Sequence, residues 1–244
     1  MGGTVKKKLL TFFKNRTVWL AAAAIIITVV VVLCLPTKTE YAISIPSPAT
    51  TGDDANSSIR RADVTKDTVQ SVLKTLQRAE SYSRVYKITT LWSGGESEST
   101  LSVWKNSSKI RISISRGGTV KNILIDGNNL SIWYDGSSNV FHSTLSDAAA
   151  ASELDEFSRL VTYEDILGVP ADDVLVGDYV EHAGQSCISA KYKSNNYVNQ
   201  IYVSIRSGLL VSAEIDDGDT PVYKMESVST DLTAPAENFF TAPA

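Results

Sequence analysis

The sequence predicts an α+β fold in which a single N-terminal transmembrane helix is followed by an antiparallel sheet with helices. Three observations support this prediction. Residues 17–35 form an uncharged apolar run, many later segments alternate apolar and polar side chains with a period of two, and a few segments show helical spacing. Tight turns between short alternating segments are typical of an antiparallel meander.

The apolar run TVWLAAAAIIITVVVVLCL has the length that a helix needs to cross the hydrocarbon core of a bilayer. Five basic residues and no acid precede its end, and Pro36 follows it. By the positive-inside rule, we expect residues 1–16 to be a cytoplasmic tail and residues 17–35 to anchor the chain in the cell membrane. The rest of the chain is then extracytoplasmic.

Two alternatives to an uncleaved anchor stay open at this point. Cleavage after Ala42 would place Glu40 at position −3, which is a weak site for a signal peptidase. Lipidation would modify Cys34, although Val-Val-Leu precedes it in place of small residues. Cys34 lies in the predicted membrane segment and Cys187 lies beyond it, so we expect no disulfide between them.

Charge and composition narrow the classes of partner. The whole chain has a net charge of −4. Its first 35 residues contain five basic residues and no acid, so the remainder has a net charge of −9. An acidic extracytoplasmic part excludes nucleic acid, whose binding requires a basic surface. Residues 36–62 are rich in Pro, Ser, Thr, Asp and Asn, and we expect them to form a flexible stalk before one domain at residues 63–244.

The predicted domain begins with a helix at residues 63–79, in which apolar residues recur every three or four positions. Strands are then expected around residues 82–92, 101–105, 110–115, 120–125, 130–134 and 139–143. Residues 147–160 and 163–167 have helical spacing. Alternation returns in four further segments, at residues 188–192, 201–205, 209–215 and 222–228.

Several local patterns in this order resemble the LolA-like superfamily, which includes the lipoprotein carrier LolA and the regulator RseB. They are KIRISIS at residues 109–115, NILIDGNNLSIWYDGSSNVF at 122–141, NQIYVSIRSGLLVSAEI at 199–215 and ENFFTAP at 237–243. Ile205 follows Ser204 where the family often has an acid, and an anchor replaces the usual secretion signal. The resemblance implies a curved antiparallel half-barrel with helices packed in its concave face. Relatives use that hollow for acyl chains or for contacts with other envelope proteins.

No constellation of catalytic or metal-ligating residues is recognisable. His142 and His182 are the two histidines and stand far apart, and no nucleophile elbow or phosphate-binding glycine loop is present. The acidic run at residues 216–219 is typical of a hairpin turn and lacks the spacing of a calcium loop. We therefore expect no enzyme, no metal and no cofactor.

Five aromatic residues of the first half-sheet are the candidate ligand-binding residues: Trp92, Trp104, Trp133, Tyr134 and Phe141. Aromatic side chains in this position belong either to the core under the helices or to the lining of an apolar hollow. Trp104 and Trp133 are out of phase with their neighbours Val103 and Ile132, which indicates apolar side chains on both faces of the sheet.

Two functions fit these features. One is an interaction module that binds or regulates another envelope protein, and the other is binding of lipid or lipoprotein acyl chains in the hollow. An anchor and a stalk favour the first, because a tethered domain cannot shuttle across a gap.

Overall fold

A computed structural model describes residues 59–147, 150, 153–154 and 160–243, all of which belong to a compact unit at residues 43–244. The predicted cytoplasmic tail, the predicted anchor with Cys34 and most of the predicted stalk lie outside these residues. Within the described part of the chain, every helix is too short or too polar to cross a membrane.

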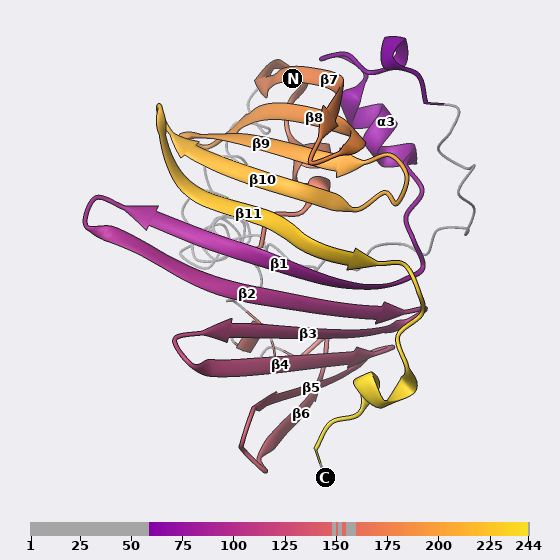
Figure 1. The fold of residues 1–244 in the computed structure, drawn as a ribbon, viewed down its shortest axis with the longest axis vertical. Helices are drawn as coiled ribbons and strands as arrows, with labels where there is room; N and C mark the ends of the chain where they lie inside the picture. Colours follow the sequence, from indigo (N-terminus) through magenta and orange to yellow (C-terminus); the bar gives the residue numbers. More distant parts are fainter. Residues whose placement is uncertain (1–58, 148–149, 151–152, 155–159, 244) are drawn as a thin grey trace, which may run out of the picture. The chain divides into compact units, whose positions relative to one another are not determined.

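In the described part of the chain, eleven antiparallel strands form one open sheet in the order β6-β5-β4-β3-β2-β1-β11-β10-β9-β8-β7 (Figure 1). Two meanders are joined where the first strand pairs with the last, from Ser83 opposite Asp231 to Thr90 opposite Tyr223. The strands are β1 (Ser81–Trp92), β2 (Gly95–Asn106), β3 (Lys109–Arg116), β4 (Thr119–Asp126), β5 (Asn129–Tyr134), β6 (Val140–Thr144), β7 (Val174–His182), β8 (Gln185–Ser194), β9 (Tyr197–Ser204), β10 (Leu210–Asp217) and β11 (Thr220–Asp231).

Alternation gives this sheet two different faces. The first face, defined by Tyr86, Leu101 and Ile114, carries most of the buried aliphatic side chains, and these three are partners in successive strands. The second face, defined by Trp104 and Arg111, carries residues of the opposite parity. Because side chains alternate along a strand, the sequence assigns each residue to a face once the register is known.

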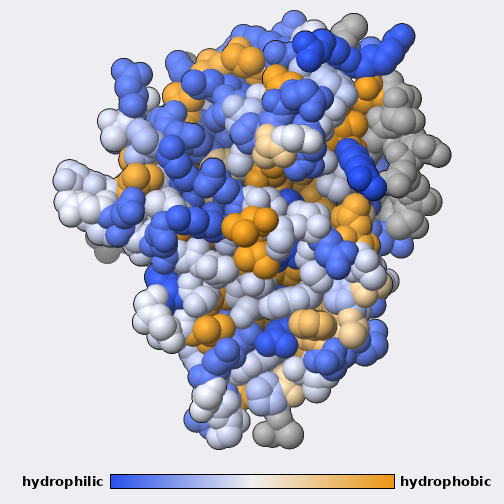
Figure 2. All heavy atoms as spheres, in the orientation of Figure 1, coloured by the Kyte–Doolittle hydropathy of each residue, from blue (hydrophilic) through white to orange (hydrophobic). Residues whose placement is uncertain are grey.

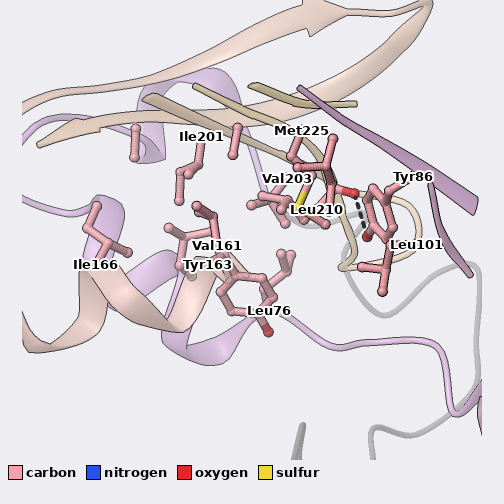
Figure 3. Packing of buried hydrophobic residues seen from close by; sticks show 14 of the residues in the cluster. Leu76, Tyr86, Leu101, Val161, Tyr163, Ile166, Ile201, Val203, Leu210 and Met225 are labelled. Atoms are coloured by element: carbon pink, nitrogen blue, oxygen red, sulfur yellow. Dashed lines mark hydrogen bonds between the residues drawn. The ribbon is translucent and has the colours of Figure 1, made fainter. Parts of the chain in front are cut away.

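Within the described residues the helices are few and short. Those with buried side chains pack on the first face, except the last one, whose Phe240 packs on the second. The helices are η1 (Arg61–Asp63), α3 (Val69–Thr75), η2 (Tyr163–Gly168), η3 (Ala171–Asp173) and η4 (Glu237–Phe240), all but α3 being 3-10 helices. Figure 3 shows Val161, Tyr163 and Ile166 facing Ile201 and Val203 across the core. The side-chain amide of Gln70 donates to two carbonyl oxygens at the end of η2, at 2.7 and 2.8 Å, and so ties α3 to η2.

The prediction of a helix over residues 63–79 is wrong at both ends, because the α-helix covers Val69–Thr75 alone. Leu76 is extended, and the next residues run against the β9–β10 turn, where Ala79 donates its backbone N–H to Ser207 at 2.9 Å. This contact replaces the helical hydrogen bonds that the apolar spacing would otherwise favour. Ile59, which belongs to the predicted stalk, packs against the main hydrophobic core that the first face of the sheet forms with the helices.

Strand β7 was not expected from the sequence, because Gly177 interrupts its alternation. A Cβ at Gly177 would lie 2.3 Å from the carbonyl oxygen of Thr65 and 2.6 Å from Cβ of Val69. The glycine therefore lets the start of α3 approach the edge of the sheet closely. Of the helix predicted at residues 147–160, the structure describes Asp147, Ala150, Glu153, Leu154 and Leu160. The middle three have helical backbone, and the two at the ends do not.

Candidate functional site

The apolar side chains of the first face are covered by the chain itself. Ile123, Ile125 and Leu130 of the β4–β5 hairpin are each 1% exposed, and they belong to one cluster with Leu154 and Val161. The aliphatic hollow that the resemblance implies is therefore occupied by the protein's own side chains along these strands.

The structure divides the five predicted site residues among three places. Trp104 and Trp133 lie on the second face. Tyr134 and Phe141 belong to the first face near its β6 edge and are 45% and 39% exposed. Trp92 lies at the β1–β2 turn, 55% exposed and next to Gly94 and Gly95. The prediction that both faces carry apolar side chains agrees with this arrangement, but the five aromatic residues form no single site.

The two tryptophans of the second face flank an arginine. The guanidinium carbon of Arg111 lies 5.4 Å from the ring centroid of Trp104 and 5.2 Å from that of Trp133. Asn122, which is fully buried, accepts hydrogen bonds from Arg111 at 3.0 Å and from Ser113 at 2.8 Å. The orientation of the guanidinium is thus fixed by its neighbours, and its burial lowers the pKa of Arg111 from the ordinary value.

The C-terminal segment, residues 236–243, covers this arrangement. Phe240 is 8% exposed and forms a small core with Leu124 and Trp133, while Phe239 stacks on Trp104 at 5.4 Å between ring centroids. Arg111 donates to the carbonyl oxygen of Phe239 at 3.3 Å. The ENFFTAP pattern is part of the family resemblance, but no local pattern places it on the tryptophans, because the two segments are far apart in the chain.

A second hollow lies where β8 begins and β9 and β11 end, and it is open and polar. Its volume is about 650 Å³, and its lining includes Ser204, Thr230 and Asp231. Behind it, Arg84 is 4% exposed and donates to the hydroxyl of Thr230 at 3.0 Å. Burial lowers the pKa of Arg84. Because the lining is mostly polar, this hollow offers little to an acyl chain.

His182 and Cys187, which could in principle take part in chemistry, make packing contacts and hydrogen bonds within the fold. His182 is half-buried, stacks on Tyr202 at 3.8 Å between ring centroids and hydrogen-bonds Ser212 at 2.8 Å. Cys187 is buried, and burial raises the pKa of its thiol to about 11, so the nucleophilic thiolate is suppressed at neutral pH. Among the residues that the structure describes, no group of His, Cys, Asp or Glu could hold a metal ion.

On the face of the molecule seen in Figure 2, hydrophilic residues cover most of the surface and apolar ones lie in separate spots. Exposed large apolar side chains are likewise distributed over several elements, with Val176 on β7, Tyr197 on β9 and Val228 on β11. Scattered apolar residues of this kind are normal on a soluble surface. The Trp104–Arg111–Trp133 arrangement is therefore the candidate functional site.

Substitution by aspartate separates the core role of one tryptophan from the surface role of the other. Trp133→Asp places a charge in a position that is 4% exposed, and we expect it to lower the free energy of unfolding by about 4 kcal/mol or more. Trp104→Asp lies in a half-buried position and should lower it by about 1–2 kcal/mol. Urea denaturation measures both, with Trp92→Asp as the exposed control, and equal losses at the two positions would contradict this assignment.

No protein-family model matches the sequence, and no curated protein is significantly similar to it. The fold is similar to that of MucB in its complex with MucA(peri), with a TM-score of 0.44 and 13% identity, over 76% of this chain and 60% of that chain. A LolA superfamily protein from Nitrosomonas europaea is similar with a TM-score of 0.34 and 13% identity, over 73% of this chain and 98% of that chain. A DUF1329 family protein from Desulfovibrio piger has a TM-score of 0.34 and 13% identity, over 72% of this chain and 95% of that chain.

The match therefore spans less than two thirds of the MucB chain. These similarities concern the fold alone and assign no function to this chain.

Proposed function

We propose that this chain is a membrane-anchored, extracytoplasmic and non-enzymatic interaction module that binds or regulates another protein of the cell envelope. The apolar run at residues 17–35 and its basic inner flank support the anchor and the orientation. A tethered domain has a high local concentration for a partner at the same membrane.

The observation that carries this proposal is the burial of the first face by the chain itself. A carrier needs an apolar hollow that is free to take an acyl chain. Here Ile110, Ile123 and Ile132 are 6%, 1% and 3% exposed, and they pack with Leu154 and Val161 in the same cluster. An acyl chain could enter only by displacing these side chains, which would forfeit well-packed aliphatic contacts.

Binding of lipid or lipoprotein acyl chains is the alternative, and one observation favours it. Tyr134 and Phe141 expose their rings at the β6 edge, and Phe141 lies directly opposite Ile132 in the neighbouring strand. A lipid tail that lay along this edge would cover both rings.

Photocrosslinking of the full-length chain in its membrane tests the choice between the two functions. With a photoactivatable fatty acid, we expect acyl adducts at residues 17–35 and none at Tyr134 or Phe141. In a second experiment, a photoreactive amino acid replaces Val140 in one variant and Val176 in another, since these two residues lie on separate surfaces. We expect one of the two variants to form an adduct with one defined envelope protein. Acyl adducts at Phe141 that disappear in Phe141→Asp, without a protein adduct at either position, would overturn the proposal in favour of lipid binding.

A further inference from the structure

The C-terminal segment occupies the second face in the way that a bound peptide would. We define the tryptophan platform as Trp104, Arg111, Leu124, Trp133 and Val140, which lie on β2 to β6. We propose that the partner docks on this platform with an acidic–aromatic segment that takes the place of residues 237–242 and forms the same single helical turn. This inference rests on the proposed function and names the chemistry of its partner.

The contacts of the C-terminal segment define what the platform recognises. The ammonium group of Lys109 lies 2.7 Å from a carboxylate oxygen of Glu237, so an acid is bound at the rim. Two residues further, the ring of Phe239 lies on Trp104 with an interplanar angle of 22°. Phe240 fills the apolar centre. The recognised pattern is therefore an acid followed at the second and third positions by two aromatic residues.

The platform is already arranged for such a ligand. Asn122 receives hydrogen bonds from Arg111 and Ser113 and donates its own amide to Asp135 at 2.7 Å. This network holds the guanidinium between the two indole rings, where it presents donors to a backbone carbonyl. A preorganised site loses less freedom when it binds, and this favours affinity.

The chain's own segment is an incomplete ligand for this site. Nε of Arg111 is buried and makes no hydrogen bond within the described part of the chain. Phe239 remains 37% exposed, and the side chain of Glu237 is 69% exposed, so its ion pair with Lys109 is screened by water. A partner segment could place a hydrogen-bond acceptor against Nε of Arg111 and bury an aromatic ring more fully than Phe239 is buried. Such a segment would bind more tightly than the one that it replaces.

Tethering makes the C-terminal segment a competitor of the partner. A segment connected by a short linker acts at an effective concentration of the order of millimolar, and a free ligand must overcome that advantage. β11 ends at Asp231 and η4 begins at Glu237, so the linker here is short. The platform is consequently accessible to a partner only when the segment detaches.

A synthetic peptide with the sequence of residues 233–243, TAPAENFFTAP, is the probe for this inference. Its binding to the full-length chain is measured by fluorescence anisotropy of a labelled peptide. Phe240→Ala weakens the binding of the chain's own C-terminal segment to the platform. We expect the variant protein to bind the free peptide at least about tenfold more tightly than the parent protein does. Trp104→Ala added to Phe240→Ala should abolish that gain, and a peptide with alanine in place of both phenylalanines should not bind.

Folding of the variant is checked by its near-ultraviolet circular dichroism. If Phe240→Ala unfolds, Glu237→Ala combined with Phe239→Ala removes contacts that are largely exposed, and the same gain is expected. A folded variant of either kind that binds the peptide no better than the parent overturns the inference. A concentration-dependent dimer that the peptide dissociates would assign the platform to a second copy of the chain, and this also overturns it.

The crosslinking positions distinguish failure of this inference from failure of the proposed function. Val140 belongs to the platform, whereas Val176 lies on the β7 edge at the other end of the sheet. A protein adduct at Val140 supports the docking surface. An adduct at Val176 alone leaves the interaction module in place and overturns the platform as its docking surface.

Discussion

Replacement of Gly208 by alanine is expected to lower the free energy of unfolding by about 3 kcal/mol or more. Gly208 has a φ of +66°, and a Cβ built on it would lie 2.1 Å from the carbonyl oxygen of Gln77 and 2.9 Å from Cα of Arg78. Both atoms belong to the backbone that links α3 to β1, so neither can move without displacing an element. The substitution therefore adds a steric clash to an unfavourable backbone conformation.

Gly127 provides the matched control, because its φ is +59° and no atom lies within 4 Å of a Cβ built there. Gly127→Ala retains the conformational penalty of a left-handed residue, about 1 kcal/mol, without the clash. Chemical denaturation of the two variants measures the difference. Equal losses of stability would show that the close approach at Gly208 has no energetic consequence.

Arg78→Ala is expected to destabilise the protein by about 3–5 kcal/mol, because it leaves a buried carboxylate without its partner. The guanidinium of Arg78 contacts the carboxylate of Glu164 and the hydroxyl of Tyr163, and the side chains of Arg78 and Glu164 are 12% and 19% exposed. Lys87→Ala breaks the exposed ion pair with Glu98, which water screens, and should leave the stability nearly unchanged. Arg78→Met combined with Glu164→Leu removes both charges and should recover most of the loss.

The same pair predicts a dependence of stability on pH. Burial raises the pKa of Glu164 from 4.5 to about 7; a hydrogen bond from the backbone opposes the rise, and the neighbouring Asp165 adds to it. The folded state then binds more protons than the unfolded state between these two values. The contribution of Glu164 to the free energy of unfolding accordingly falls as the pH rises from about 4.5 to about 7.

Urea denaturation of the parent and of Glu164→Gln at about pH 5 and about pH 7.5 isolates this contribution, since other groups titrate equally in both. The difference between the two proteins should change with pH, and it should change more steeply in the Arg78→Ala background. A difference that is independent of pH would show that Glu164 titrates alike in the folded and unfolded states.

The sequence predicts most of the strands, because the period of two and the turns between strands are local properties. KIRISIS shows the point: its isoleucines lie on the first face, and its arginine lies on the second. The phase of Trp104 and Trp133 against their neighbours likewise predicts apolar side chains on both faces. The helix predicted over residues 63–79 is too long, since apolar spacing does not reveal that the backbone after Leu76 packs against Gly208.

What covers each face was decided by the tertiary structure. Lys109 and Glu237 are 128 positions apart in the chain, and no local periodicity relates them. The β1–β11 pairing closes that distance by bringing the start and the end of the domain together. The sequence by itself therefore determined most of the strands, their faces and the two tryptophans that face away from the main core. The tertiary structure decided that the chain's own side chains fill the first face and that its C-terminal segment lies on the tryptophans, because these contacts depend on long-range pairing.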